Sequence, residues 1–250
     1  MNVEGAEREE ELIQSRVRAV VRSKHYAYEK IWFNPGYVYR IQELERAILA
    51  ALGRTGHANM ETLTALDIGC GSGDWTRQLI NWGAQPQNLC GVDLVKERVD
   101  AARRLCAPGV RIDCGSALQL RHPDRSFDVV ILFSVFCMIL NDDVCRGIAR
   151  EAMRVLKHNG VILWCDYRYH PPGEKDARGV NLRQLRQFFP GARITARPIH
   201  PLPPLLRRIG PYAPFMCGIV GLVPFARTHY FATIEHAVRA KEVALSELEG

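Results

Sequence analysis

The sequence lacks any C-x-x-C pair, although eight cysteines are spread along its 250 residues. Four of them, Cys70, Cys90, Cys137 and Cys165, lie in apolar stretches typical of strands. This spacing favours buried free thiols in a reducing compartment over a disulfide framework or a zinc site. The C-x-x-x-C-x-x-C motif of iron–sulfur radical enzymes is missing too. We therefore expect no metal ion and a cytoplasmic protein.

Long apolar runs are also missing. No window reaches about 18 uninterrupted apolar residues, which argues against a transmembrane helix. The first residues, MNVEGAEREEELIQSRVR, are charged rather than apolar, which argues against a secretory signal. A hydrophobic fraction of 47% with 24% charged residues is ordinary for a globular chain, and this length suits one α/β domain with additions.

The net charge of +6 is unevenly distributed. Between Arg168 and Arg227 there are ten Lys/Arg against two acidic residues, a local net charge of +8. Two interpretations stay open for this region. It is either an ordinary solvated surface or a cationic rim that attracts an anionic substrate, nucleic acid or lipid headgroups.

Apolar runs alternate with helical patterns from residue 62 onward. Helices are expected at 5–22, 37–52, 74–83, 96–106, 141–160 and 181–189, and strands at 62–68, 88–94, 110–115, 127–136, 161–167, 192–197 and 229–235. Strands that are apolar throughout and separated by helices indicate a sheet covered on both faces. We predict a doubly wound, Rossmann-like α/β fold with a mostly parallel, seven-stranded sheet.

A glycine-rich turn, DIGCGSGD, follows the first expected strand. A strand, such a turn and a helix N-terminus together form a nucleotide-binding element. The Lys and Ser/Thr of a P-loop are absent, and Asp74 stands where a dinucleotide fingerprint needs its last glycine. The pattern D-x-G-x-G-x-G instead suits a ligand that carries an ammonium, a sulfonium and a ribose.

This turn resembles the first motif of class I S-adenosylmethionine-dependent methyltransferases. The resemblance continues through Asp93 in CGVDL, RHPDRSFDVVILFSVFCMI and RVLKHNGVILWCDYR, in the family's order and spacing over residues 62–168. It implies that Asp93 holds the ribose and that Gly69 and Gly71 pass close to the methionyl part. The full set of cofactor contacts implied in this way is Asp67, Gly69, Cys70, Gly71, Gly73, Trp75, Asp93, Leu94, Ser116, Ala117, Phe133 and Ser134.

One position departs from the family pattern. The third expected strand ends in CGSAL, where the family often has an acidic residue that bonds the adenine amino group. Ser116 occupies that position here, and its hydroxyl can accept one hydrogen bond.

Methyl transfer to a hydroxyl also needs a proton acceptor. We expect Asp166 or His170 to act as the catalytic base, because both follow the fifth strand at the edge where parallel sheets place their sites. Capping, or pairing with Arg168, is the alternative role for Asp166. His200 and His229 are further candidates.

The acceptor side is expected to be aromatic. Six aromatic residues lie between Tyr26 and Tyr39 and suit a lid, although they could equally dock two helices onto the sheet. The motif [DN]-P-P-[YF] of base and glutamine N-methyltransferases is absent after the fourth strand. The expected substrate-side residues are Tyr26, Trp32, Phe33, Tyr37, Phe136, Tyr167 and Arg168.

We predict an N-terminal helical lid over residues 1–58 and a methyltransferase domain over 59–250, with a Pro-rich substrate-side insertion at 198–226. The resemblance implies methylation of a hydroxyl or amine on a small or lipid-linked molecule, such as a sugar or a natural product. The alternatives are an RNA methyltransferase and a non-catalytic protein that binds only the cofactor or a partner. Peripheral membrane contact stays open, because PFMCGIVGLVPF in the insertion is apolar but too short to span a bilayer.

Overall fold

The protein is described by a computed structural model that covers residues 3–22, 33–171, 177–202 and 226–237, with a few positions between 205 and 223. Of the expected substrate-side residues, Tyr26 and Trp32 lie outside the described residues, as does most of the Pro-rich segment 198–226.

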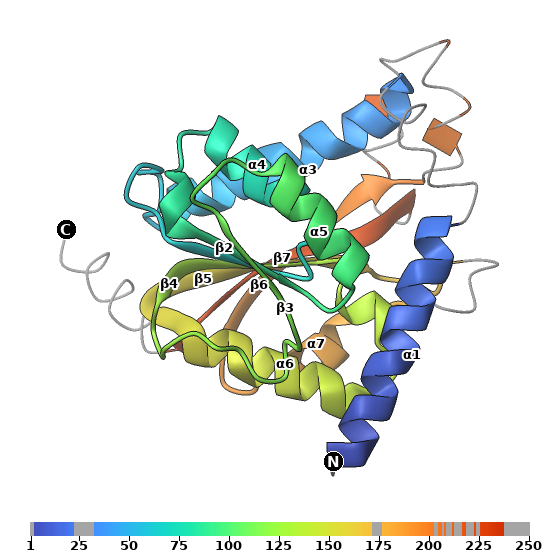
Figure 1. The fold of residues 1–250 in the computed structure, drawn as a ribbon. Coiled ribbons are helices and arrows are strands. Elements are labelled where there is room, and N and C mark those ends of the chain that lie inside the picture. The colour runs from blue at the N-terminus through green and yellow to red at the C-terminus, as the bar shows by residue number, and fades with distance from the viewer. Residues whose placement is uncertain are drawn as a thin grey trace.

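Seven strands form one sheet in the order β3-β2-β1-β4-β5-β7-β6 (Figure 1). The strands are β1 (Ala65–Ile68), β2 (Leu89–Asp93), β3 (Arg111–Cys114), β4 (Phe127–Phe133), β5 (Leu156–Tyr167), β6 (Arg193–Pro201) and β7 (Arg227–Glu235). Only the pairings of β7 with β5 and β6 are antiparallel among the strands described. The predicted mostly parallel, seven-stranded α/β sheet is confirmed.

Helices cover both faces of this sheet. The helices α3 (Pro35–Arg54), α4 (Asp74–Asn81) and α5 (Lys96–Leu105) lie on one face, and α6 (Asp142–Val155) and α7 (Leu182–Phe188) on the other (Figure 1). Short 3-10 turns occur at η2 (Pro86–Asn88) and η3 (Phe136–Met138). The first helix, α1 (Val3–Arg22), contacts η3 and passes one end of α6 (Figure 1). No helix in the described part of the chain is long and apolar enough to cross a membrane.

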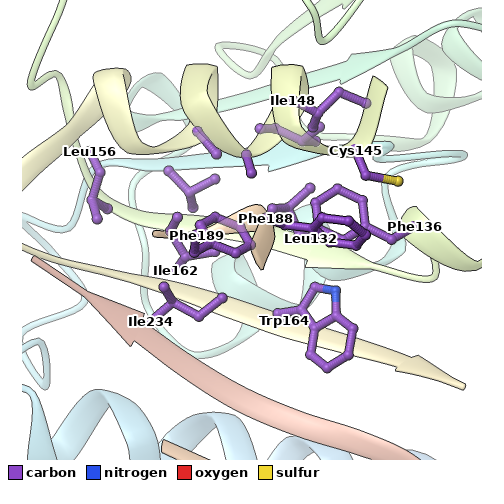
Figure 2. Packing of buried hydrophobic residues seen from close by; sticks show 14 of the residues in the cluster. Leu132, Phe136, Cys145, Ile148, Leu156, Ile162, Trp164, Phe188, Phe189 and Ile234 are labelled. Atoms are coloured by element: carbon purple, nitrogen blue, oxygen red, sulfur yellow. The ribbon is translucent and has the colours of Figure 1, made fainter. Parts of the chain in front are cut away.

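Alternate residues of the central strands supply two separate cores. Leu132 and Trp164 point toward α6 and α7, where they pack with Phe136, Phe188 and Phe189 (Figure 2). The intervening residues of the same strands pack under α3 and α4. This two-sided burial explains why the central strands are apolar throughout.

Several predicted boundaries were wrong. The strand expected over 127–136 ends at Phe133. The helix expected over 141–160 ends at Val155, and Leu156 already belongs to β5. Leu156 is fully buried and pairs with Phe127 of β4, so strand pairing replaces the last turn of the expected helix. Lys157 forms an ion pair with Asp128 at 2.9 Å instead of closing the helix.

Candidate functional site

A cavity opens where β1, β2, β3 and β4 end. Its space amounts to about 690 Å³ when the open solvent at its mouth is included. Among the residues expected to contact the cofactor, its lining includes Gly69, Asp93, Leu94, Ser116, Ala117 and Ser134. The structure therefore brings together residues from four strand ends that are far apart in the sequence.

The glycine turn has a backbone that other residues adopt poorly. Gly69, Gly71 and Gly73 all have positive φ, between 56° and 79°. A Cβ on Gly69 would lie 2.7 Å from Cγ2 of Val135, closer than such atoms approach one another. The amide of Gly69 donates to the Val92 carbonyl at 2.7 Å, which holds the turn against the end of β2. Glycine is required here for both conformation and space.

Asp93 is fixed by the backbone around it. Its Oδ2 accepts from the Gly71 amide at 2.8 Å and its Oδ1 from the Val95 amide at 2.9 Å. The Arg98 guanidinium lies 3.7 Å from Oδ2. Since a carboxylate has about four acceptor sites, two amides leave capacity for a ligand diol.

Ser134 has a strained backbone. It follows β4 with φ of 56°, which is uncommon outside glycine, and its amide donates to the Cys165 carbonyl at 2.8 Å. Residues held in such conformations cluster at functional sites, which fits its place in the cavity wall.

Ser116, after β3, meets a residue from the N-terminal helix. Its hydroxyl donates to the carboxylate of Glu10 and accepts from the Leu118 amide at 3.1 Å. Glu10, Ile13 and Val17 of α1 all line the cavity. The helix thus forms one wall of the site.

The other residues expected to contact the cofactor lie outside the cavity lining. Cys70, Gly71 and Gly73 belong to the turn behind it. Trp75 packs edge-on against Phe133, with ring centroids 5.3 Å apart, among the residues under α3. Asp67 is buried, accepts from the Thr76 hydroxyl at 3.2 Å, and has its pKa raised by burial to about 7.

The two expected bases have contrasting environments. Asp166 is fully buried and accepts from the amides of Phe136 at 3.1 Å and Cys137 at 3.2 Å. Burial raises its pKa to about 7. His170 is exposed, and its Nδ1 lies 3.3 Å from the Ala177 carbonyl oxygen. Neither residue lines the cavity. The contacts of Asp166 with the first amides of η3 are those of a cap, the alternative role that the sequence left open.

The expected substrate-side residues do not gather in one place. Phe136 is fully buried and packs edge-on against Phe188 at 5.4 Å, so it is a core residue rather than an apolar wall for a substrate. Phe33 is 88% exposed. Tyr37 lies in the first turn of α3, where its amide is capped by the Asn34 side chain at 3.4 Å.

A polar cluster forms where β5, β6 and β7 meet α3; we call Tyr167, His200 and His229 the histidine cluster. The His229 ring lies 4.2 Å from Tyr167 and 4.9 Å from His200, centroid to centroid. Burial lowers the pKa of both histidines well below its usual value. Both ring nitrogens of His200 lack a hydrogen-bond partner among the described residues, and its φ is 59°.

Arg168 lies beside this cluster. Its guanidinium is sandwiched between the rings of Tyr169 and Tyr230, at 4.6 and 4.8 Å from their centroids. Arg168 and Tyr167 therefore lie together at the end of β5, and their role on the substrate side stays a prediction. The described residues contain no cluster of His, Cys, Asp or Glu that could hold a metal ion.

The sequence interpretation included α1 in the lid predicted over residues 1–58, but it expected the lid's contacts from the aromatic stretch between Tyr26 and Tyr39. The described cavity is instead walled by Glu10, Ile13 and Val17 of α1. Their spacing of three and four residues puts them on one helical face, and this was the available indication. Nothing in the local pattern showed which surface that face covers.

Comparison with known proteins identifies the central part of the chain. Residues 65–160 match the sequence family described as "Methyltransferase domain". A demethylmenaquinone methyltransferase of Bacillus licheniformis is 29% identical over 40% of this chain and 43% of its own. The tRNA N(3)-cytidine methyltransferase METTL2 of Gallus gallus is 29% identical over 41% of this chain and 30% of its own.

The same fold occurs in solved structures. The magnesium protoporphyrin IX methyltransferase of Synechocystis PCC 6803, solved with bound S-adenosylmethionine, aligns with a TM-score of 0.58. The alignment covers 89% of this chain and 97% of that one at 15% identity. The chain spans less than half the length of the curated relatives it matches, so the similarity establishes the fold and the central domain.

Proposed function

Because the chain carries a class I S-adenosylmethionine-dependent methyltransferase domain, we propose that it transfers a methyl group from that cofactor to a small or lipid-linked molecule. The acceptor atom is a hydroxyl oxygen, or alternatively an amine nitrogen, as on a sugar or a natural product. The observation that carries the proposal is the cavity in which the glycine turn, Asp93 and Ser116 converge.

The residues present fit the cofactor. The positive φ angles of the glycine turn allow a ligand to approach the backbone more closely than any side chain would permit. Asp93 is held by two amides and retains acceptor sites for a ribose diol. Leu94, Val135 and Ile139 supply apolar surface for a planar base. The acidic Asp93 and Glu10 also suit a ligand of net positive charge.

When bound, S-adenosylmethionine supplies an electrophilic methyl group on a sulfonium. The protein's task is then to align the acceptor in line with that methyl and to exclude water, and orientation alone can contribute roughly 7–11 kcal/mol. The α1 helix walls one side of the cavity and limits access of solvent. Ser134 and Gly69 follow the central strands β4 and β1 and belong to the cavity lining.

For proton removal, the histidine cluster stands beside Asp166 and His170 as a candidate, and none of these residues lines the described cavity. An imidazole with a lowered pKa is neutral at pH 7, and it is a weaker base than one that titrates near neutral pH. His200 combines a strained backbone with ring nitrogens that have no described partner, a combination that favours a role in chemistry over packing. The carboxylate of Asp166 already accepts hydrogen bonds from two backbone amides, which favours a structural role.

A small acceptor is favoured by two further features. The absence of a [DN]-P-P-[YF] motif after β4 disfavours a base acceptor. The Arg168 guanidinium, which packs on the rings of Tyr169 and Tyr230, offers a positive charge to an anionic group. A relative named for demethylmenaquinone supports a lipid-linked class. We propose that the reaction takes place in the cytoplasm, and Arg207, Arg208 and the apolar PFMCGIVGLVPF are sequence features that suit peripheral contact with a membrane.

RNA is the second candidate acceptor. The local charge of +8 between Arg168 and Arg227, from ten basic and two acidic residues, and the match to a tRNA methyltransferase favour it. Phosphate contacts would make RNA binding fall steeply as salt rises. A protein that only binds the cofactor is the third possibility, and turnover of any acceptor would exclude it.

Cofactor binding is tested first, by native mass spectrometry of the purified protein and calorimetric titration with S-adenosylhomocysteine. We expect micromolar or tighter binding, weakened about tenfold or more in Asp93→Ala through loss of a charged hydrogen bond. No binding by the wild type, or binding of a nicotinamide cofactor instead, would refute the proposal.

The acceptor is tested by incubating the protein with methyl-labelled S-adenosylmethionine and three cell fractions: polar metabolites, an organic lipid extract and total RNA. We expect label in a small molecule of the polar or lipid fraction, with Asp93→Ala as the negative control. Label confined to RNA would favour the second candidate. Cofactor binding with no label in any fraction would favour the non-catalytic one.

A further inference from the structure

The carboxylate of Glu10 lies in the cavity wall, although Glu10 is more than a hundred residues from the strand end it meets. Its Oε1 accepts from the Ser116 hydroxyl, whose oxygen also accepts from the Leu118 amide at 3.1 Å. Glu10 forms no ion pair within the described part of the chain. Its remaining acceptor sites are therefore available to a ligand in the cavity.

The position of Glu10 is fixed by contacts on both sides of it along α1. Ile13 is 9% exposed in the main core, and Val17 packs against the same core. Arg16 donates to Glu9 at 3.4 Å and to the Met138 carbonyl at 3.5 Å, while Arg18 meets Glu97 of α5 at 3.4 Å. These contacts connect α1 to η3 and α5 and hold Glu10 over the end of β3.

The order of the strands places Glu10 relative to Asp93. Strands β2 and β3 are neighbours, and the Gly115 amide donates to the Asp93 carbonyl at 3.1 Å. Adjacent strands lie about 4.8 Å apart, so a nucleoside whose ribose were held by Asp93 would have Ser116 and Glu10 within reach of its base. Leu94 and Ile139 line the space between, as apolar faces for a planar ring.

We propose that Glu10 recognises the exocyclic amino group of the adenine base of the cofactor, with Ser116 as the residue that positions it. The proposal rests on the proposed function, because it concerns the same cavity. A carboxylate accepts a hydrogen bond from an amino group, whereas it repels a carbonyl oxygen, which is also an acceptor. Glu10 therefore selects a 6-aminopurine over a 6-oxopurine. The carboxylate that β3 lacks is supplied by a different element, α1.

The test compares S-adenosylhomocysteine with S-inosylhomocysteine, which carries a carbonyl in place of the amino group. Both are titrated calorimetrically into the wild type and into Glu10→Gln, an isosteric amide that can also donate. We expect the wild type to prefer the adenine ligand by about tenfold or more, a preference that Glu10→Gln removes or reverses. Glu11→Gln, an exposed neighbour on the same helix, is the control and should keep the wild-type preference.

A relocation variant separates recognition from folding. Glu10→Ala should lose adenine affinity about tenfold, and Glu10→Ala combined with Ser116→Asp should recover most of it, because the carboxylate then stands on β3 itself. Circular dichroism melting checks that each variant is folded.

Each outcome has a distinct meaning. If the wild type binds neither ligand, the proposed function fails. If the wild type binds the adenine ligand and Glu10→Gln keeps its full preference over the inosine ligand, the inference about Glu10 is overturned. Equal loss of affinity for both ligands in Glu10→Gln would also overturn it, because Glu10 would then only hold α1 in place.

Discussion

Single glycines in the turn after β1 matter because of both their φ angle and the space around them. Gly69→Ala would place a methyl group 2.7 Å from Val135 at a φ of 72°. We expect a loss of about 1–3 kcal/mol in the free energy of unfolding, measured by urea titration. Gly53→Ala is the matched control, since no atom lies within 4 Å of the place that its Cβ would take, and helix propensity should make it stabilising by about 0.5–1 kcal/mol. Equal effects of the two changes would contradict this explanation.

Asp166 shows how a buried carboxylate can look catalytic in sequence and act as a structural cap. In Asp166→Asn, the side-chain NH₂ group is a donor, and it faces one of the two backbone N–H groups that donate to the carboxylate in the wild type. We expect about 1–3 kcal/mol lower unfolding free energy, with affinity for S-adenosylhomocysteine retained. Unchanged stability together with abolished turnover would instead assign Asp166 to catalysis.

At the scale of the element, α3 depends on its first turn. The Asn34 side chain accepts from the amides of Gly36 at 2.9 Å and Tyr37 at 3.4 Å. Asn34→Ala should lower the unfolding free energy by about 0.5–2 kcal/mol, whereas Asn34→Asp, which keeps the acceptor, should stay close to wild type. Chemical denaturation of the three proteins measures both values, and a stable alanine variant would show that this cap is unimportant.

The α1 helix should become more protected when the cofactor binds, because its Glu10, Ile13 and Val17 wall the cavity. We expect tryptic cleavage at Arg16 and Arg18 to slow with S-adenosylhomocysteine concentration, by up to about 100-fold at 100 times the dissociation constant. Mass spectrometry of timed digests follows the two sites. Cleavage at Arg183 of α7, which is exposed and lies outside the cavity lining, is the internal reference. Unchanged cleavage in α1 at saturating ligand would show that the helix does not respond to the cavity.

For the whole molecule, buried titratable groups act in opposite directions on stability. Burial lowers the pKa of His200 and His229 well below 6.5. Just below pH 6.5 these histidines are therefore protonated in the unfolded chain and neutral in the folded chain. The free energy of unfolding falls as the pH is lowered through this range. Burial raises the pKa of Asp67 and Asp166 from 3.8 to about 7. Between these two pH values the carboxyl groups are protonated in the folded chain and ionised in the unfolded chain. The free energy of unfolding therefore falls as the pH rises through this range.

We therefore expect the opposite effects of the histidine pair and the aspartate pair on the free energy of unfolding to offset each other between about pH 4 and 6.5. Replacing His200 and His229 by glutamine should raise the unfolding free energy relative to wild type as pH falls from 6.5 to 5, by up to about 1.4 kcal/mol per pH unit for each histidine. Urea titrations at several pH values measure the difference. The exposed His158→Gln variant is the control. A difference that does not change with pH would show that the buried histidines are not neutral in the fold.

The sequence determined the sheet and the cofactor end of the site, because both depend on local pattern. Apolar strands and the spacing of Gly69, Gly71 and Gly73 followed by Asp93 are readable along the chain, and a parallel sheet brings such strand ends to one edge. The predicted fold was confirmed at this level. The site residues themselves stay predictions, with Gly69, Asp93 and Ser116 in one cavity.

Tertiary contacts decided what local pattern leaves open. Leu156 is a strand residue because Phe127 pairs with it, Phe136 is core because Phe188 covers it, and Asp166 turns toward two amides. The placement of Glu10 on Ser116 depends on the docking of α1 against η3 and α5. A carboxylate supplied from more than a hundred residues away leaves no periodic pattern in the sequence, because only the packed chain brings the two residues together.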